Sequence, residues 1–145
     1  MSWSRRVVFD TSTLVGAVLK PGSAPHQALM QALARCDVCA SVQTWLELER
    51  VMQRDRFDRY LPRDARMAFV AVTRTSMHFF PVTQADEDAL PPPCRDPMDN
   101  KFLALVQVCQ ADLLVSSDED LLVFHPWCGI SVHRPAEFLS TIAAP

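Results

Sequence analysis

Two short apolar runs, each leading to an aspartate with hydroxyl residues beside it, constrain the fold of this chain most. Val7-Val8-Phe9 runs into Asp10-Thr11-Ser12, and Leu113-Leu114-Val115 runs into Ser116-Ser117-Asp118. Fully apolar runs of this length are typical of strands buried on both faces, as in a parallel sheet. In open sheets of this kind, ligands bind beyond the carboxyl ends of the strands. If the two strands are neighbours, Asp10 and Asp118 face one crevice there.

Strands and helices alternate along the whole chain. Strands are expected at 5–9, 38–40, 77–80, 113–116 and 130–133, and helices at 14–19, 25–34, 42–53, 62–74, 96–110 and 135–142, with a helical turn at 118–123. The segment 81–95 contains three consecutive prolines and is expected to be a loop. This alternation predicts an α/β fold with a parallel sheet covered on both faces, in one domain spanning residues 1–145.

The composition excludes several classes of protein. Of the 145 residues, 49% are hydrophobic and 21% are charged, which indicates one globular domain and not a disordered chain. No apolar run approaches the ~18–20 residues of a membrane helix, and the N-terminus lacks a signal-peptide pattern, so we expect a cytoplasmic protein. The five cysteines include one C-x-x-C pair, Cys36 and Cys39, with no second pair to complete a zinc site. We expect reduced thiols.

Further acids are expected at the edge that holds Asp10 and Asp118. Asp96 and Asp99 open the helix that feeds the fourth strand, and Asp120 follows closely on Asp118. Each acid alone has an ordinary explanation as a helix cap or a partner of the helix dipole. Together they repel, by roughly 4 kcal/mol for charges about 4 Å apart at an effective dielectric near 20, so the cluster requires protonation or a cation. Hard oxygen donors favour one or two Mg²⁺ or Mn²⁺ ions, which suit phosphoryl chemistry.

Several segments resemble the PIN domain nucleases, in the same order and with the same spacing. The matching segments are residues 8–17, 47–51, 94–104, 111–121 and 135–139. The resemblance is closest to the VapC-like branch, the toxins of toxin–antitoxin systems. It implies a three-layer α/β/α sandwich whose five-stranded parallel sheet has the order 3-2-1-4-5. It also implies metal-dependent endoribonuclease activity, a homodimer and a cognate antitoxin protein.

The same resemblance implies the site residues. The catalytic and metal-binding acids would be Asp10, Glu47, Asp99 and Asp118. The supporting residues would be Ser12, Asp96, Ser116 and Asp120. Ser12 stands where the family usually has Asn, and Ser116 where it commonly has Thr. Both keep a polar side chain near the metal, so we expect a modified metal site and not a lost one. On a helical wheel Glu49 lies nearer the middle of the apolar face than Glu47, whereas the resemblance favours Glu47.

The charge is unevenly distributed along the chain. Residues 1–75 carry 11 Lys and Arg against 7 Asp and Glu, whereas residues 76–145 carry 3 against 10. Six arginines crowd one predicted helix–loop–helix, together with Phe57 and Tyr60; they are Arg50, Arg54, Arg56, Arg59, Arg63 and Arg66. Guanidinium groups and aromatic faces suit single-stranded RNA, and we expect RNA contact at Arg50, Arg54 and Arg56. The alternative is a solvated face with ion pairs to Asp55, Asp58 or Asp64.

Three hypotheses for function follow. The first is a metal-dependent endoribonuclease that hydrolyses RNA phosphodiester bonds. The second is a non-catalytic PIN-fold module that binds RNA or protein; the complete acid set counts against it. The third is a different doubly wound phosphatase or receiver domain. An aspartyl phosphatase needs Asp where this chain has Ser12, and a receiver domain needs Asp after the third strand, where this chain has Phe80-Pro81.

Overall fold

The computed structural model describes residues 5–91 and 99–143, and a five-stranded sheet forms its centre. The strands are β1 (Arg6–Phe9), β2 (Asp37–Ala40), β3 (His78–Phe79), β4 (Leu113–Val115) and β5 (Ser131–His133). All neighbouring strands are parallel, in the order β3-β2-β1-β4-β5. The predicted parallel sheet and its order 3-2-1-4-5 are confirmed. β1 and β4 are central neighbours, with Phe9 opposite Val115, so their carboxyl ends lie side by side.

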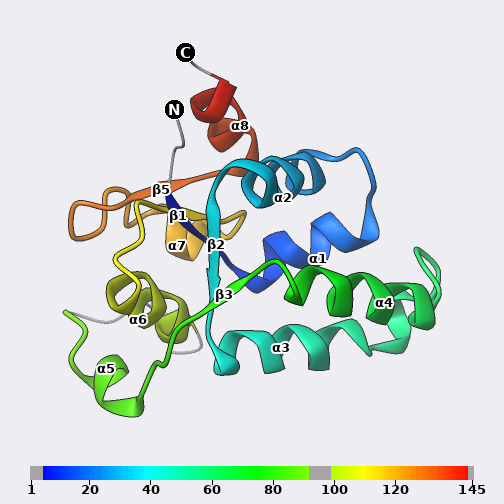
Figure 1. Ribbon diagram of the computed structural model, residues 1–145, viewed down its shortest axis with the longest axis horizontal. Helices are drawn as coiled ribbons and strands as arrows, with labels where there is room; N and C mark the ends of the chain where they lie inside the picture. The colour runs from blue at the N-terminus through cyan, green and yellow to red at the C-terminus, as the bar shows by residue number, and fades with distance from the viewer. Residues whose placement is uncertain (1–4, 92–98, 144–145) are drawn as a thin grey trace.

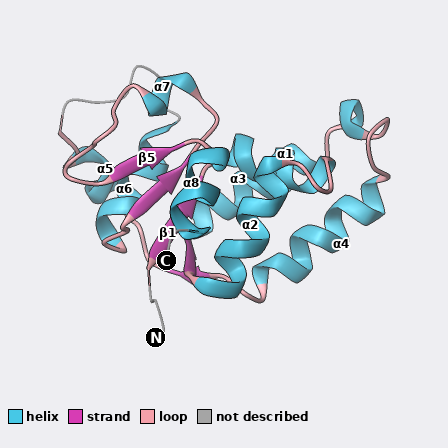
Figure 2. Ribbon diagram, turned by 90° about the horizontal axis from the view of Figure 1, so that it is seen from above, coloured by secondary structure: helices cyan, strands magenta, loops and turns pink. Residues whose placement is uncertain are grey.

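Helices cover both faces of the sheet (Figure 1). They are α1 (Thr11–Leu19), α2 (Ala24–Arg35), α3 (Val42–Met52), α4 (Arg63–Arg74), α5 (Gln84–Asp88), α6 (Asn100–Val108), α7 (Glu119–Leu122) and α8 (Pro135–Ala143), with a 3₁₀ turn η1 (Asp55–Phe57). Figure 2 shows α1–α4 and α8 on one side of the sheet, and α5 and α6 on the other. This is the predicted three-layer α/β/α arrangement.

Alternate residues of each strand enter opposite cores. Val7, Phe9 and Val115 pack with α1, α2, α3 and α8, whereas Val8 and Leu114 pack with α6 and α7. All five side chains are nearly or fully buried. Because both faces of the strands are covered, neither face needs polar residues, which is why these runs are apolar throughout.

The prediction of a loop over residues 81–95 was wrong in part, since it contains the short helix α5. Thr83 and Asp86 form a reciprocal capping box at its start: the Asp86 carboxylate accepts from the Thr83 backbone N–H at 2.7 Å, and the Thr83 hydroxyl accepts from the Asp86 backbone N–H at 3.2 Å. The helix has five residues, too few for an apolar periodicity to reveal it. Asp96, the predicted start of the next helix, lies outside the described residues.

Two further predictions concern membranes and thiols. No helix within residues 5–91 and 99–143 combines the length and the hydrophobicity needed to cross a bilayer. The described cysteines Cys36, Cys39, Cys109 and Cys128 form no disulfide, and the reduced state stays a prediction.

Candidate acidic site at the carboxyl edge of the sheet

A pocket of about 360 Å³ lies where β1 and β4 end. Four of the acids predicted from the sequence line it. They come from four separate segments: Asp10 follows β1, Glu47 lies on α3, Asp99 precedes α6, and Asp118 precedes α7. Ser12 also lines the pocket. The fold therefore brings together carboxylates that are up to 108 positions apart in the chain.

Asp10 is the most enclosed of these acids, with only 4% of the residue exposed. Its Oδ1 accepts the backbone N–H of Thr13 at 2.9 Å, so it also caps α1. The Ser12 hydroxyl lies 3.1 and 3.2 Å from its two oxygens, and the Ser116 hydroxyl donates to Oδ2 at 2.5 Å. Burial raises the pKa of Asp10 above its ordinary value, and the hydrogen bonds from Ser116, Thr13 and Ser12 oppose that rise. A cation at this carboxylate would favour its ionised form further.

Ser116 connects the ends of β1 and β4. It is fully buried, and its hydroxyl donates to Asp10 while accepting the backbone N–H of Asp118 at 2.9 Å. The Asp118 Oδ1 accepts the backbone N–H of Asp120 at 2.9 Å, so Asp118 caps α7. Asp120 itself is not among the residues that line the pocket. Ser116 therefore sets the positions of two of the acids relative to each other.

Glu47 faces a cation that sequence reasoning did not anticipate. Lys101 Nζ, from α6, lies 2.6 Å from Glu47 Oε2, and the two side chains are only 14% and 17% exposed, respectively. Beyond this ion pair, the buried Oε2 has no hydrogen-bond partner among the described residues. Lys101 is one of three basic residues in the acidic half of the chain, a signal that could have drawn attention to it. Glu49, the rival acid on α3, does not line the pocket.

The donors fit a hard divalent cation by their chemistry. Carboxylate and hydroxyl oxygens are the ligands that Mg²⁺ and Mn²⁺ prefer. Glu47 Oε2 is a buried oxygen that already attracts a cation, the Lys101 ammonium. In the part of the chain that the structure describes, however, no three His, Cys, Asp or Glu side chains lie close enough together to hold an ion.

A family model described as "PIN domain" matches residues 6–120 of the chain. The chain belongs to the PIN domain family. The crystal structure of PAE2754 from Pyrobaculum aerophilum is similar, with a TM-score of 0.64 and 13% identity; the match covers 99% of this chain and 100% of that chain. At this identity the likeness concerns the fold alone. No curated protein sequence matches the chain. PIN domains are generally nucleases that use divalent metals, so family membership indicates a nucleic-acid substrate.

The PIN domain carries an exposed arginine-rich loop beside this pocket. Arg56 and Phe57, in η1, line the pocket together with the acids. The Arg56 guanidinium lies over the Phe57 ring, 4.8 Å from its centroid. Arg50 and Arg54 are exposed but are not among the lining residues. Of the three arginines predicted to contact RNA, Arg56 is thus the one at the acidic pocket.

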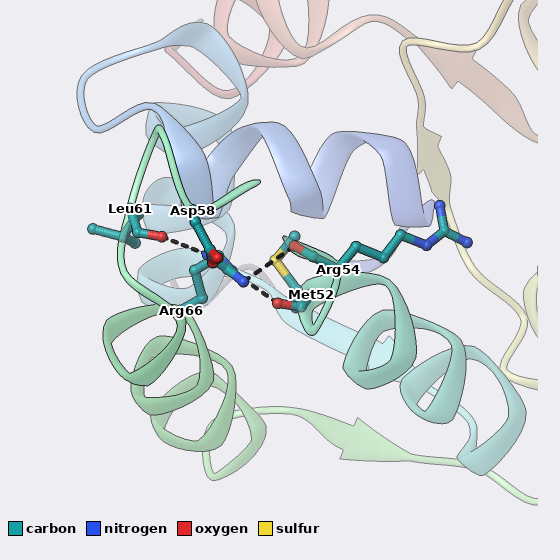
Figure 3. A network of polar contacts seen from close by, with 5 residues as sticks. All are labelled: Met52, Arg54, Asp58, Leu61 and Arg66. Atoms are coloured by element: carbon teal, nitrogen blue, oxygen red, sulfur yellow. Dashed lines mark hydrogen bonds and ion pairs between the residues drawn. The ribbon is translucent and has the colours of Figure 1, made fainter. Parts of the chain in front are cut away.

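The prediction that Arg66 belongs to this basic surface was wrong, because Arg66 is fully buried. Its Nε donates to the Met52 carbonyl at 2.8 Å, and its Nη2 donates to the Arg54 carbonyl at 3.2 Å. Its Nη1 donates to the Leu61 carbonyl at 2.5 Å and to the Asp58 carboxylate at 2.9 Å (Figure 3). All four acceptors lie between the end of α3 and the start of α4. Arg66 therefore holds the backbone of the PIN domain's arginine-rich loop from within.

Proposed function

We propose that this PIN domain is a Mg²⁺- or Mn²⁺-dependent endoribonuclease that hydrolyses phosphodiester bonds of RNA. The observation that carries the proposal is the single pocket lined by Asp10, Glu47, Asp99 and Asp118. The nuclease character follows from the family. RNA as the substrate rests on the resemblance of the sequence to the endoribonuclease branch, and the exposed arginines beside the pocket support it.

The residues of the pocket would divide the work as follows. Asp10, Asp99 and Asp118, completed by Glu47, would hold one or two ions. When bound, the metal supplies Lewis acidity to the phosphate and a lowered pKa to the attacking water.

The other polar groups act around these acids. Ser12 and Ser116 direct hydrogen bonds at Asp10, which keep its oxygens oriented and favour the ionised form. Arg56 offers a guanidinium to the phosphate at the margin of the pocket. Lys101 balances the charge of Glu47 while no divalent ion is present.

Hydrolysis of a labelled single-stranded RNA by the purified protein tests this proposal. We expect cleavage with Mn²⁺ or Mg²⁺, its loss on addition of EDTA, and its loss in the Asp10→Asn and Asp99→Asn variants. Asp64→Asn is a matched control, because Asp64 is exposed on α4 and does not line the pocket. Cleavage that persists in both Asp10→Asn and Asp99→Asn would refute the site assignment.

A second candidate is a non-catalytic PIN-fold module that binds RNA or protein. One observation favours it: Lys101 already forms an ion pair with Glu47 in the pocket. Titration of the protein with Mn²⁺ by calorimetry separates the two candidates. Binding of Mn²⁺ that disappears in Asp10→Asn supports the nuclease, whereas RNA binding without metal binding or cleavage supports the module.

We further propose that the protein acts in the cytoplasm as the toxin of a toxin–antitoxin pair, as a homodimer whose cognate antitoxin covers the acidic pocket. The VapC-like resemblance of the sequence supports this part. Induced expression in bacteria is expected to arrest growth, and Asp10→Asn is expected to relieve the arrest. Sedimentation of the purified protein measures its oligomeric state, and co-purification with the product of a small adjacent gene tests the antitoxin. Growth unaffected by the wild-type protein would contradict the toxin role.

A further inference from the structure

A second pocket, of about 730 Å³, adjoins the acidic pocket. Its lining is the continuous loop segment 55–60, which includes η1. Arg56 and Phe57 line both pockets, so the two hollows are neighbours on one surface. A chain molecule that lies in the acidic pocket and continues past Arg56 would therefore enter this second pocket.

The side chains of the second pocket combine flat cations with aromatic rings. The Arg59 guanidinium lies 4.7 Å from the centroid of the Tyr60 ring and donates to the Tyr60 hydroxyl at 2.6 Å. Tyr60 is 46% exposed, and Arg56 stacks on Phe57 at the shared border. Aromatic faces stack on nucleobases, and arginines pair with phosphates, so this combination is typical of single-strand binding surfaces.

The charge of the loop also favours an anionic ligand. Arg54, Arg56 and Arg59 are all exposed. Of the two acids among them, Asp58 has its charge balanced by Arg66, with which it forms an ion pair at 2.9 Å. The negative charge of Asp55 is then outnumbered by the positive charges of the three arginines, so the loop is net positive.

The loop is held in one shape before any ligand arrives. Burying a guanidinium is costly unless its donors are satisfied, and Arg66 donates to four acceptors, one of them within this loop (Asp58) and three that flank it, the carbonyls of Met52, Arg54 and Leu61. Arg54 takes part only through its carbonyl, and its side chain extends away from Arg66 (Figure 3). A preorganised loop loses less conformational entropy on binding, which favours affinity.

We infer that the pocket lined by residues 55–60 is a nucleotide subsite for the RNA strand whose phosphodiester lies in the acidic pocket. Tyr60 stacks on a base, and Arg59 pairs with a phosphate of the same strand. Arg66 fixes the loop that carries both. The inference rests on the proposed ribonuclease function, because it takes the strand that is cleaved as its ligand.

Fluorescence anisotropy with a labelled octauridylate, in the presence of EDTA, tests the subsite separately from cleavage. Tyr60→Ala is expected to weaken binding roughly five- to hundredfold, the equivalent of about 1–3 kcal/mol of stacking per base. Arg59→Ala is expected to reduce the slope of log affinity against log salt by about 0.7, the value of one phosphate contact on a single strand. Arg63→Ala is the control, since Arg63 is exposed on α4 and lines neither pocket.

The outcomes separate this inference from the proposed function. Octauridylate that binds Tyr60→Ala and Arg59→Ala as it binds the wild type overturns the subsite, whatever the cleavage assay gives, and so does a wild-type protein that does not bind it. If Tyr60→Ala and Arg59→Ala bind octauridylate more weakly in EDTA, as expected, but the wild type shows no Mn²⁺-dependent cleavage, the subsite is retained and the proposed hydrolysis is refuted.

Discussion

Lys101 Nζ lies 2.6 Å from Oε2 of Glu47, one of the four acids that line the pocket. The ammonium and a divalent ion would compete for the same carboxylate. Charges about 4 Å apart at an effective dielectric near 20 interact by roughly 4 kcal/mol, so removing the ammonium has a large effect on a cation nearby. Tenfold in affinity corresponds to only about 1.4 kcal/mol, so Lys101→Met is expected to bind Mn²⁺ at least tenfold more tightly than the wild type. Isothermal titration calorimetry measures this directly.

Lys20→Met is the matched control for Lys101→Met, because Lys20 is exposed at the end of α1 and does not line the pocket. Its Mn²⁺ affinity is expected to equal that of the wild type. Unchanged or weaker Mn²⁺ binding by Lys101→Met would show that the ammonium and the metal do not compete.

The buried carboxylate of Asp10 predicts a pH-dependent stability. Burial raises its pKa above the ordinary value of 3.8, so the folded state favours the protonated form. The stability from this preference is fully present below the ordinary pKa and is lost as the pH rises through the raised one. Asp10→Asn removes that loss. In EDTA we expect it to raise the melting temperature at pH ~7 by about 2–4 °C, for about 1 kcal/mol, and to have little effect near pH ~4.

Differential scanning calorimetry at the two pH values checks the Asp10→Asn prediction. Asp64→Asn, at an exposed position on α4, is expected to melt with the wild type at both. A melting temperature of Asp10→Asn below that of the wild type at neutral pH would mean that the hydrogen bonds to the carboxylate outweigh the cost of its burial.

Substitution of Ser116 is expected to lower the rate of RNA cleavage, although this residue does not contact the substrate. Its hydroxyl donates to Asp10 and accepts the backbone N–H of Asp118, so Ser116→Ala loosens two acids at once. The loss of one hydrogen bond to the carboxylate also raises the pKa of Asp10 further. We expect RNA cleavage to fall roughly 10–100-fold and the acid limb of its pH profile to move to higher pH. Ser116→Thr keeps the hydroxyl and is expected to retain most of the activity; equal losses in the Ala and Thr variants would contradict this role.

The sheet could be predicted because the uninterrupted apolar sequence of its strands indicates that they are buried. Val7, Val8 and Phe9 are apolar without interruption, which is typical of a strand covered on both faces. Once β1 and β4 are neighbours, the positions of Asp10 and Asp118 follow from parallel geometry alone. The acidic edge of the sheet was therefore accessible from the sequence.

The partners of two cations, the half-buried Lys101 and the fully buried Arg66, could not be predicted in the same way. Lysine and arginine are rarely enclosed, so a charged residue on a helix is interpreted as exposed by default. Arg66 is enclosed because three backbone carbonyls and Asp58 converge on it, and carbonyl positions are not encoded by any local pattern. Lys101 meets Glu47 only because α3 and α6 lie close together at the edge of the sheet. Contacts between distant segments had to come from the fold.

Substitution of Arg66 is expected to cause the largest loss of stability of any single substitution. Arg66→Met keeps an apolar stem but removes every donor, so the carbonyls of Met52, Arg54 and Leu61 lose their partner. Breaking a buried charged network of this kind costs about 3–5 kcal/mol, which urea denaturation measures. Arg63→Met, on the exposed side of the same helix, is expected to stay within about 0.5 kcal/mol of the wild type.

A second variant separates the contribution of the carbonyls from that of the ion pair. Asp58 is 56% exposed at its side chain, so water screens its charge, and Asp58→Asn is expected to cost about 1 kcal/mol or less. A loss from Asp58→Asn as large as that from Arg66→Met would mean that charge pairing, and not the satisfied carbonyls, holds the loop. A loss from Arg66→Met as small as that from Arg63→Met would mean that the loop keeps its shape without the guanidinium. In that case the preorganisation argued for the nucleotide subsite would lose its structural cause.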